Sequence, residues 1–304
     1  MAKILLMICM LASSLAFGEY SRVYMDSQAS FVSDSKGVSI AYKTLGQADA
    51  EVVVLVMGLG ASHSLWGDTF VQSIVSAGYR VVLIDNRDTG ASSRFDEWGK
   101  PVLWWELLKN QLGFGVNAPY LLDDMAADVV SVMDTLEIDR AHIVGASMGG
   151  MIAQIVAADY PQRTQSLISI MSTTGAPHLP PPSSESSNLL KNIASNDNDE
   201  NDSVAAAMTL RGFYPEAVPR QLMAILKTGD RTVRVKTIEA PTLVLHGADD
   251  TLIPPAHGQH TTDTITGSKF VIFEGMGHDM PEAVMPKILA EMTAHMALWP
   301  VAGD

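Results

Sequence analysis

Residues 142–157 read HIVGASMGGMIAQIVA. The apolar run before Gly145 is typical of a buried strand, and an alanine-rich run with helical spacing begins near Met148. Ser147 stands between the two runs, flanked by Gly145 and Gly149. A Cβ at either flank of such a turn would collide with the neighbouring strand or helix. The stretch therefore predicts a strained turn that lifts a serine hydroxyl clear of a sheet, at the start of a helix.

A serine hydroxyl becomes a nucleophile only when a base takes its proton, so we looked for a histidine and a carboxylate at later strand ends. Thr242 to Leu245 and Phe270 to Phe273 are two further strand-like runs. The first is followed by Asp249 and Asp250, and the second by His278. Ligand sites of open parallel sheets lie beyond the carboxyl ends of the strands. Asp249 and Asp250 are adjacent, so they cannot both face the histidine. The spacing alone does not show which of the two does.

Strand-like runs alternate with helical patterns along most of the chain, which predicts a mostly parallel sheet covered by helices on both faces. SQASFVSDSKG and VSIAYKTLG predict a hairpin at its start. The other expected strands are Val52–Met57, Val81–Ile84, Ala141–Val144 and Leu167–Met171, and the expected helices are Leu65–Ala77, Leu121–Leu136, Met148–Ala158 and Ala283–Leu298.

Two regions break this alternation. Ala91–Tyr120 is rich in tryptophan, and it is equally consistent with a functional excursion or a satellite packing helix. Residues 176–236 begin with a proline-rich stretch and predict an inserted cap. The cap contains the acidic run NDNDEND at 196–202, which lacks the Gly and Glu positions of an EF-hand and is expected to be a solvated loop. The predicted core comprises residues 19–175 and 237–304.

The first 18 residues have the composition of a secretory signal peptide. Lys3 precedes an apolar run from Ile4 to Phe17, and small residues suit cleavage before Glu19. The run is short for a membrane span, so an uncleaved anchor is the weaker alternative. We therefore expect a periplasmic or secreted protein with no stable membrane insertion after cleavage. Cys9 is the only cysteine, so the mature chain would have no disulfide or thiol chemistry.

The overall composition excludes two classes of partner. The chain has 304 residues, 47% of them hydrophobic, and a formal net charge of −14. Binding nucleic acid requires clustered Lys and Arg, and docking on anionic membranes requires basic residues. We expect no nucleic-acid partner, and nothing in the sequence predicts the oligomeric state.

Six segments together resemble the α/β-hydrolase superfamily, and more closely its aclacinomycin methylesterase-like branch. They are LVMGLG, DNRDTGAS, LDDMAADVVSVMDTL, AHIVGASMGGMIAQ, PTLVLHGADDTLIP and GMGHDMPE, and they spread over Leu55 to Glu282. The resemblance implies an eight-stranded, mostly parallel sheet with a small helical cap, and a Ser-His-Asp triad. The family's H-G-x-x-D-x-x-x-P pattern assigns the triad acid to Asp250 rather than Asp249, beside Ser147 and His278.

The resemblance also implies an oxyanion hole made of backbone N–H groups. Met148 follows the nucleophile and supplies one donor, and Leu59, in the loop after Met57, supplies the second. The family usually has His-Gly where this chain has Met57-Gly58, but backbone donors do not depend on that side chain. Asp85, Arg87 and Asp88 are expected to hold a loop by ion pairing, as in the family, rather than to act in catalysis.

The remaining histidines receive structural interpretations. His246 is expected to be structural and His142 half-buried at the start of a strand. His257 and His260 are spaced i, i+3, but no carboxylate or cysteine cluster completes a metal site, so we expect a solvated surface pair. No metal or cofactor is expected.

The sequence thus predicts an exported serine hydrolase that cleaves a small or hydrophobic carboxylic ester through an acyl-serine. A serine nucleophile argues against haloalkane dehalogenase and epoxide hydrolase chemistry, in which relatives use aspartate. Cofactor-free perhydrolase, lactonase, carbon–carbon hydrolase and proline iminopeptidase-like activities stay open. A non-catalytic ligand-binding protein on the same fold is the alternative from a different class.

Overall fold

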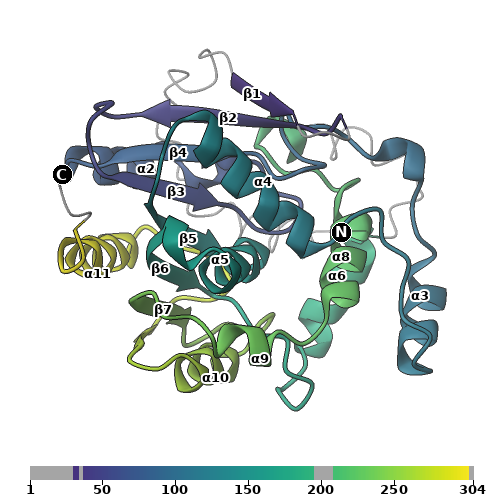
Figure 1. Cartoon of the computed structure of the whole chain (residues 1–304). Helices are drawn as coiled ribbons and strands as arrows, with labels where there is room; N and C mark the ends of the chain where they lie inside the picture. Colours follow the sequence, from purple (N-terminus) through teal and green to yellow (C-terminus); the bar gives the residue numbers. More distant parts are fainter. Residues whose placement is uncertain (1–29, 34–36, 195–207, 301–304) are drawn as a thin grey trace.

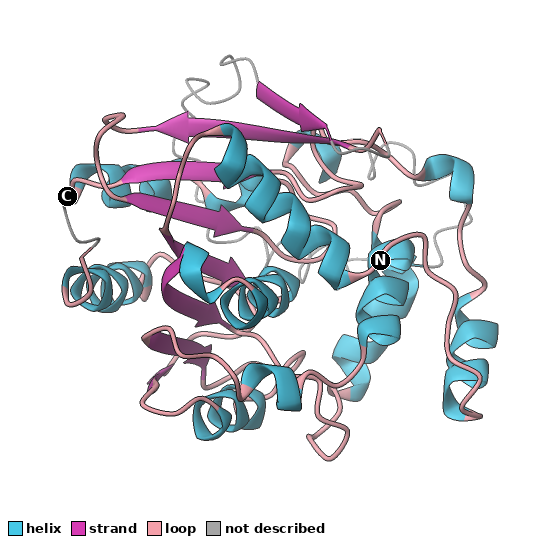
Figure 2. Cartoon of the chain, viewed as in Figure 1, coloured by secondary structure: helices cyan, strands magenta, loops and turns pink. Residues whose placement is uncertain are grey.

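A computed structural model of the chain describes residues 30–33, 37–194 and 208–300. Its centre is an eight-stranded sheet with the order β1-β2-β4-β3-β5-β6-β7-β8 (Figures 1 and 2). The strands are β1 Ser30–Ser33, β2 Ser39–Leu45, β3 Val52–Val56, β4 Arg80–Ile84, β5 Ala141–Ala146, β6 Thr164–Ile170, β7 Thr242–Gly247 and β8 Lys269–Phe273.

Strand directions follow the predicted topology. The predicted hairpin is present as β1 and β2, which pair antiparallel, and β2 is also antiparallel to β4. Every other neighbouring pair, from β4–β3 to β7–β8, is parallel. The carboxyl ends of six parallel strands therefore meet at one edge of the sheet, as the sequence predicted.

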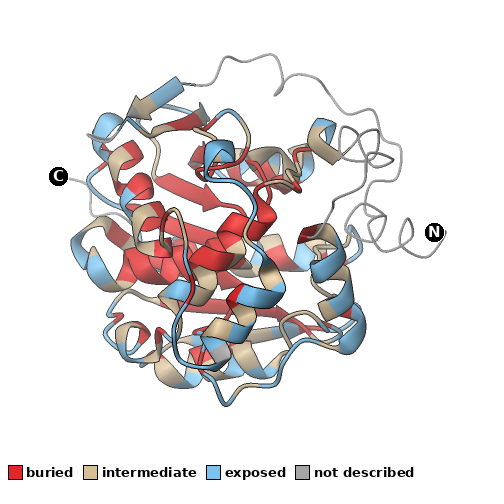
Figure 3. Ribbon diagram, turned by 90° about the vertical axis from the view of Figure 1, so that its right-hand side faces the viewer, coloured by how far each residue is buried: buried red, intermediate tan, exposed pale blue. Residues whose placement is uncertain are grey.

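Helices cover both faces of the sheet, and the central strand β3 is accordingly apolar and buried at every position. Val54 on β3 packs in one core cluster with α4 (Leu122–Thr135) and α5 (Met148–Asp159). Its neighbour Leu55 points to the opposite face and packs with α2 (Asp68–Ser76) and α11 (Met285–Ala297). Figure 3 shows the buried residues gathered along the sheet between these helix layers.

The chain leaves the sheet after β6 and returns to it with β7. The connection carries α6 (Ser184–Ala194), α8 (Val218–Thr228) and α9 (Thr232–Val235). Figure 1 shows α6 and α8 beyond the arrowheads of the parallel strands, over the edge where ligands bind in such sheets. Ala224 and Val235 belong to the main core cluster, so the end of this insertion is part of the packed body. The cap boundaries at 176 and 236 stay a prediction.

Helix boundaries differ from the sequence expectation at two places. The expected helix at Leu65 begins as a 3₁₀ turn, His63–Trp66, and α2 starts only at Asp68, because Gly67 breaks the helical path with a φ of 73°. The helix α10 (Ala256–Thr264) was not predicted. Its sequence AHGQHTTDT has little apolar periodicity, so tertiary contacts decide its conformation.

The aromatic excursion does not pack as a satellite helix. It contains the 3₁₀ turn Asp96–Trp98 and α3 (Leu103–Gln111), and Trp104 on α3 is 69% exposed. Its Glu106 is instead buried, accepting hydrogen bonds from Lys109 Nζ at 2.7 Å and from Asn117 N–H at 3.1 Å. Trp104, Trp105 and Leu108 of α3 therefore face solvent while its carboxylate is buried.

Some predictions lie outside the described residues. These are the signal peptide at 1–18 with Cys9, residues 35 and 36 of the hairpin turn expected at 35–37, and the acidic run at 196–202. Among the residues that the structure places, no helix combines the length and apolarity that crossing a bilayer requires.

Candidate active site

The turn between β5 and α5 adopts the strained geometry that its glycines predicted. Ser147 has φ 55° and ψ −120°, a conformation in which side chains are strained. A Cβ on Gly145 would overlap the backbone carbonyl of Gly149 at the start of α5. A Cβ on Gly149 would overlap the carbonyl of Val56 on β3. The close approach of strand and helix therefore requires glycine at both flanks of the serine.

Backbone hydrogen bonds hold Ser147 in this conformation. Its N–H donates to Ile170 O at 2.9 Å, at the end of the adjacent strand β6. Its carbonyl accepts from the N–H groups of Gly150 and Met151 and from Ser172 Oγ at 2.8 Å. The surrounding structure thus fixes the nucleophile's backbone, and strain of this kind costs about 1–3 kcal/mol.

The three side chains predicted to form a triad meet at the carboxyl edge of the sheet. His278, in the loop after β8, places Nε2 2.9 Å from Ser147 Oγ. Its Nδ1 lies 2.7 Å from Asp250 Oδ2, in the loop after β7. The His278 side chain is 16% exposed and that of Asp250 is fully buried, so solvent reaches the imidazole but not the carboxylate behind it.

Asp250 is held as a carboxylate by its surroundings. Its Oδ1 accepts from the N–H groups of Leu252 and Ile253, both at 2.9 Å. Its Oδ2 faces His278 Nδ1 and, at 3.5 Å, His246 Nε2. Burial alone would raise the pKa of Asp250, but the hydrogen bonds from His246 and His278 and the Ile253 N–H together hold it well below its usual range.

Asp249 does not contact His278, so the geometry distinguishes the two neighbouring carboxylates that spacing could not. Its Oδ2 accepts from Gly275 N–H at 3.2 Å, and its own N–H donates to Met276 O at 3.0 Å. A Cβ on Gly247 would overlap the Met276 carbonyl, so the β8 loop lies directly against the end of β7. Asp249 therefore fastens the loop that carries His278, and Asp250 alone contacts the imidazole.

The two predicted oxyanion donors lie beside the serine. Met148 is the first residue of α5, where a backbone N–H has no partner within the helix. A Cβ on Gly58, next to Leu59, would lie 3.1 Å from Ser147 Cβ and 3.6 Å from its Oγ, so the loop after β3 runs against the nucleophile. Within the described part of the chain, neither N–H donates to a protein acceptor. This is the condition that an oxyanion hole built from these two N–H groups requires.

The model of the alpha/beta hydrolase fold family matches residues 51–211, which is more than half of the chain and includes Ser147. The chain belongs to the α/β-hydrolase fold family. Family and fold class are thus as the sequence resemblance implied. The β7 and β8 loops with Asp250 and His278 lie beyond the matched region, and their place in the site follows from the distances above.

Two curated relatives cover most of this α/β-hydrolase. A rhodomycin D methylesterase of Streptomyces sp. (strain C5) is 29% identical over 292 residues, which is 82% of this chain and 91% of that protein. A 2-hydroxy-6-oxononadienedioate/2-hydroxy-6-oxononatrienedioate hydrolase of Cupriavidus pinatubonensis is 31% identical over 257 residues, covering 76% and 81%. Among solved structures, the enol-lactonase from Burkholderia xenovorans LB400 superposes with a TM-score of 0.66 at 21% identity, covering 88% of this chain and 100% of that one. At that identity the likeness is one of fold.

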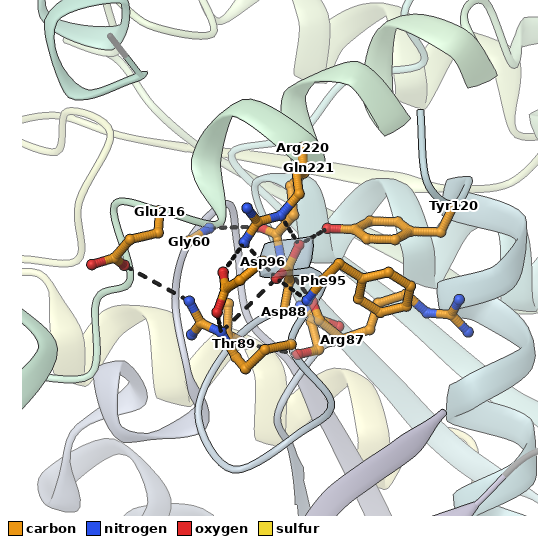
Figure 4. Close-up of polar contacts among 12 residues, drawn as sticks. Gly60, Arg87, Asp88, Thr89, Phe95, Asp96, Tyr120, Glu216, Arg220 and Gln221 are labelled. Atoms are coloured by element: carbon orange, nitrogen blue, oxygen red, sulfur yellow. Dashed lines mark hydrogen bonds and ion pairs between the residues drawn. The ribbon is translucent and has the colours of Figure 1, made fainter. Parts of the chain in front are cut away.

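The charged residues after β4 hold this part of the α/β-hydrolase together, although the sequence did not reveal their partners (Figure 4). Arg87 forms two hydrogen bonds to Asp128 on α4, at 2.7 and 2.8 Å. Asp88 receives Arg220 of α8 at 2.7 and 2.8 Å and the Tyr120 hydroxyl at 2.7 Å. Buried charges require partners, but nothing in the spacing names Asp128 or Arg220 as those partners.

Asp85, the third residue of the group, binds groups in two different loops. Its Oδ1 lies 2.6 Å from His63 Nδ1 and accepts the His63 N–H at 2.9 Å. Its Oδ2 accepts the Ala91 N–H at 3.0 Å. Asp85 therefore links the loop after β3 to the loop after β4, which is the structural role expected of it.

The other histidines are more deeply integrated than the sequence suggested. His142 is fully buried rather than half-buried, because β5 is central in the sheet and Ser166 Oγ satisfies its Nδ1 at 2.8 Å. His257 and His260 bond to Thr173 and Thr174 at 2.7 and 3.0 Å, so they join α10 to the segment after β6 instead of standing in solvent. Among the described residues, no three His, Cys, Asp or Glu side chains are placed to hold a metal ion.

Proposed function

We propose that this α/β-hydrolase cleaves a small or hydrophobic carboxylic ester through an acyl-serine intermediate, with Ser147, His278 and Asp250 as the triad. The observation that carries the proposal is the continuous chain of contacts from Asp250 Oδ2 through the imidazole to Ser147 Oγ, at 2.7 and 2.9 Å. A strained serine backbone at the start of a helix adds to it, since it presents Oγ where such a chain can activate it.

Each residue then has a defined task. Ionised Asp250 accepts the His278 Nδ1–H, which leaves Nε2 free to accept a proton. His278 takes the Ser147 hydroxyl proton as Oγ bonds to the ester carbonyl carbon. The Met148 and Leu59 N–H groups donate to the resulting oxyanion, each such donor being worth about 10²–10³ in turnover.

Collapse of the tetrahedral intermediate breaks the bond to the leaving oxygen, which takes the proton from His278 and departs as an alcohol. Water then attacks the acyl-serine, with His278 accepting its proton and returning it to Ser147 Oγ, so that a carboxylic acid is released. No step requires a metal or an organic cofactor.

Replacing Ser147 by Ala tests the assignment. Alanine keeps the Cβ and the backbone strain, so the protein should fold with an unchanged far-UV spectrum and melting temperature. Hydrolysis of p-nitrophenyl butyrate should fall by at least about 10⁴-fold. A fluorophosphonate probe should label the wild type and leave the Ser147→Ala variant unlabelled. Wild-type protein that neither turns over esters nor takes the label would refute the proposal and favour a non-catalytic binding protein.

A second candidate reaction uses the same residues. The relative from Cupriavidus pinatubonensis is named for hydrolysis of 2-hydroxy-6-oxononadienedioate and its triene analogue, at an identity slightly above that of the methylesterase. We therefore propose a substrate panel containing methyl esters, p-nitrophenyl esters and 2-hydroxy-6-oxononadienedioate. The ester proposal requires kcat/KM to be highest for an ester, and a preference for the dienedioate would replace it.

We further propose that the protein is exported and that residues 1–18 are removed. The support is the sequence pattern of a Lys followed by an apolar run and small residues before Glu19. N-terminal sequencing of protein recovered outside the cytoplasm should begin at Glu19. A chain that stays in the cytoplasm with Met1 or Ala2 at its end would refute export.

A further inference from the structure

The loop carrying the second oxyanion donor is a tight turn whose shape depends on other parts of the chain. Ala61 N–H donates to Gly58 O at 3.2 Å, closing a turn with Leu59 and Gly60 at its centre. Gly60 has φ 67°, the conformation that type II turns require at this position. In a trans peptide the C=O and N–H point in opposite directions. The Gly58–Ala61 bond therefore aims the Leu59 N–H away from Ala61.

Two backbone groups at the far end of this turn are bound by the insertion between β6 and β7. Gly60 O accepts the Tyr214 N–H at 2.6 Å, and Ser62 N–H donates to Gly212 O at 2.8 Å. Ala61 and Phe213 form an antiparallel bridge between these two bonds. A short strand-like strap of the insertion thus lies along the turn.

The Gly60 N–H, another donor of the turn, is bound by one buried side chain on α8. Gly60 N–H donates to Gln221 Oε1 at 2.7 Å, and Gln221 Nε2 donates to Arg87 O at 3.0 Å (Figure 4). Gln221 is completely buried, so bulk solvent does not reach either bond. The Leu59–Gly60 peptide is the central peptide of the turn, and it directly follows the Gly58–Leu59 peptide that carries the Leu59 N–H. The Gly60 N–H is held by Gln221 alone among the described residues.

The helix that supplies Gln221 is itself fixed. The adjacent Arg220 is 2% exposed and bonds to Asp88 twice and to Asp96 at 2.7 Å. Ile225, one turn further along α8, packs against the main core cluster. Gln221 therefore lies on a helix that is itself fixed, so its side chain can hold the turn in one position.

We propose that Gln221 is a positioning residue for catalysis, which holds the Gly58–Ala61 turn so that the Leu59 N–H faces the oxyanion at Ser147. The inference rests on the proposed acyl-serine mechanism. An oxyanion exists only in the transition state and intermediate, so a displaced donor lowers kcat and leaves KM nearly unchanged. A purely structural glutamine would instead lower stability without this selective loss.

The test compares three variants with the wild type. Gln221→Met removes both hydrogen bonds at similar volume, and Gln221→Asn keeps the amide but withdraws it by about 1.5 Å, one carbon–carbon bond. Ile225→Ala is the matched control, because it weakens the packing of the same helix without touching the turn. We expect kcat for p-nitrophenyl butyrate to fall about 10- to 100-fold in both Gln221 variants, with KM within about threefold. In Ile225→Ala we expect a lowered melting temperature and a nearly normal kcat.

Two further measurements make the outcome decisive. Binding of butylboronic acid, which forms a tetrahedral anionic adduct with a nucleophilic serine, should weaken in parallel with kcat in the Gln221 variants. Hydrogen exchange of the peptide spanning 58–62 should accelerate about tenfold or more in Gln221→Asn but not in Ile225→Ala. Exchange is independent of activity, so a wild type without esterase activity would overturn the proposed function, whereas exchange would still show whether Gln221 holds the turn. An unchanged kcat, a loss confined to KM, or unchanged exchange would overturn the inference.

Discussion

Replacing Asp250 by Asn should disable the enzyme through the tautomer of His278, and the structure shows why the new amide has only one orientation. Two N–H donors, from Leu252 and Ile253, face Oδ1 at 2.9 Å. The amide NH₂ cannot occupy that position without setting donors against donors. Oδ1 of the asparagine therefore stays on the two N–H groups, and the NH₂ takes the place of Oδ2 beside His278.

An NH₂ group in that position can only donate, so His278 Nδ1 must accept. The single proton of the neutral imidazole then resides on Nε2, which lies 2.9 Å from Ser147 Oγ in the wild type. A protonated Nε2 cannot take the serine proton, although the three side chains keep their places. The corresponding substitution in a serine protease lowers kcat about 10⁴-fold, equivalent to about 5.5 kcal/mol, and we expect a similar loss here.

The neighbouring carboxylate provides the matched control for this substitution. Asp249 accepts one bond, from Gly275 N–H, and does not contact the imidazole. We expect Asp249→Asn to change kcat/KM by no more than about threefold, as for most substitutions outside the core. Initial rates on p-nitrophenyl butyrate and the rate of fluorophosphonate labelling should fall together in Asp250→Asn. If Asp250→Asn retained activity within about tenfold of the wild type while Asp249→Asn lost it, the assignment of the acid would be wrong.

Two predictions concern stability. Ser147→Gly should be more stable than Ser147→Ala by roughly 1 kcal/mol in denaturant unfolding, because glycine accepts a φ of 55° without strain. Equal unfolding midpoints would show that the backbone at residue 147 stores no strain. Burial and, secondarily, the charge of His295 lower the pKa of His142 to about 4. In the unfolded chain the His142 imidazole has an ordinary pKa near 6.5, so it binds a proton there before it does in the folded protein as pH falls. Stability therefore declines between about pH 6.5 and 4. Urea unfolding should show that the free energy of unfolding falls by roughly 2–3 kcal/mol less in His142→Gln than in the wild type between about pH 7 and pH 4.5. An equal fall in both proteins would contradict this.

The parallel core of this fold could be predicted because each of its signals is local. A run such as Val52 to Val56 is apolar at every position only when both faces of the strand are covered. Gly145 and Gly149 mark the turn because no side chain fits there, and this holds whatever the rest of the chain does. The same is true of His278, since a histidine after a strand and a Gly-x-Gly turn has few other uses.

Features that depend on partners distant in sequence were not predictable in the same way. Arg220 and Asp88 are 132 positions apart, and nothing near either residue indicates the pairing. The short helix α10 was missed because its polar sequence carries no apolar period. The exposure of the aromatic residues of α3 was not predictable either, because an apolar pattern does not show which face of a helix packs against the protein.

The choice between Asp249 and Asp250 shows how local and distant information combine. Spacing allows either residue to reach the loop after β8, because adjacent residues differ in direction more than in position. What separates them is the pair of N–H groups from Leu252 and Ile253, which fixes Oδ1 of Asp250 and leaves Oδ2 to face the imidazole. The acid is thus chosen by backbone donors two and three residues further along, which the H-G-x-x-D pattern encodes only indirectly.

The insertion between β6 and β7 supports the turn beside the nucleophile in this chain. In α/β sheets an insertion over the carboxyl edge shapes the space for substrate, and here the same insertion supplies the Tyr214 N–H and the Gln221 amide to both polar groups of Gly60. The position that is usually histidine in the family is Met57, whose carbonyl accepts from Asn86 Nδ2 at 2.7 Å. The turn beside the nucleophile therefore takes its support from the β4 loop and from the insertion. Sequence changes in the insertion should consequently alter kcat, because the insertion binds both polar backbone groups of Gly60.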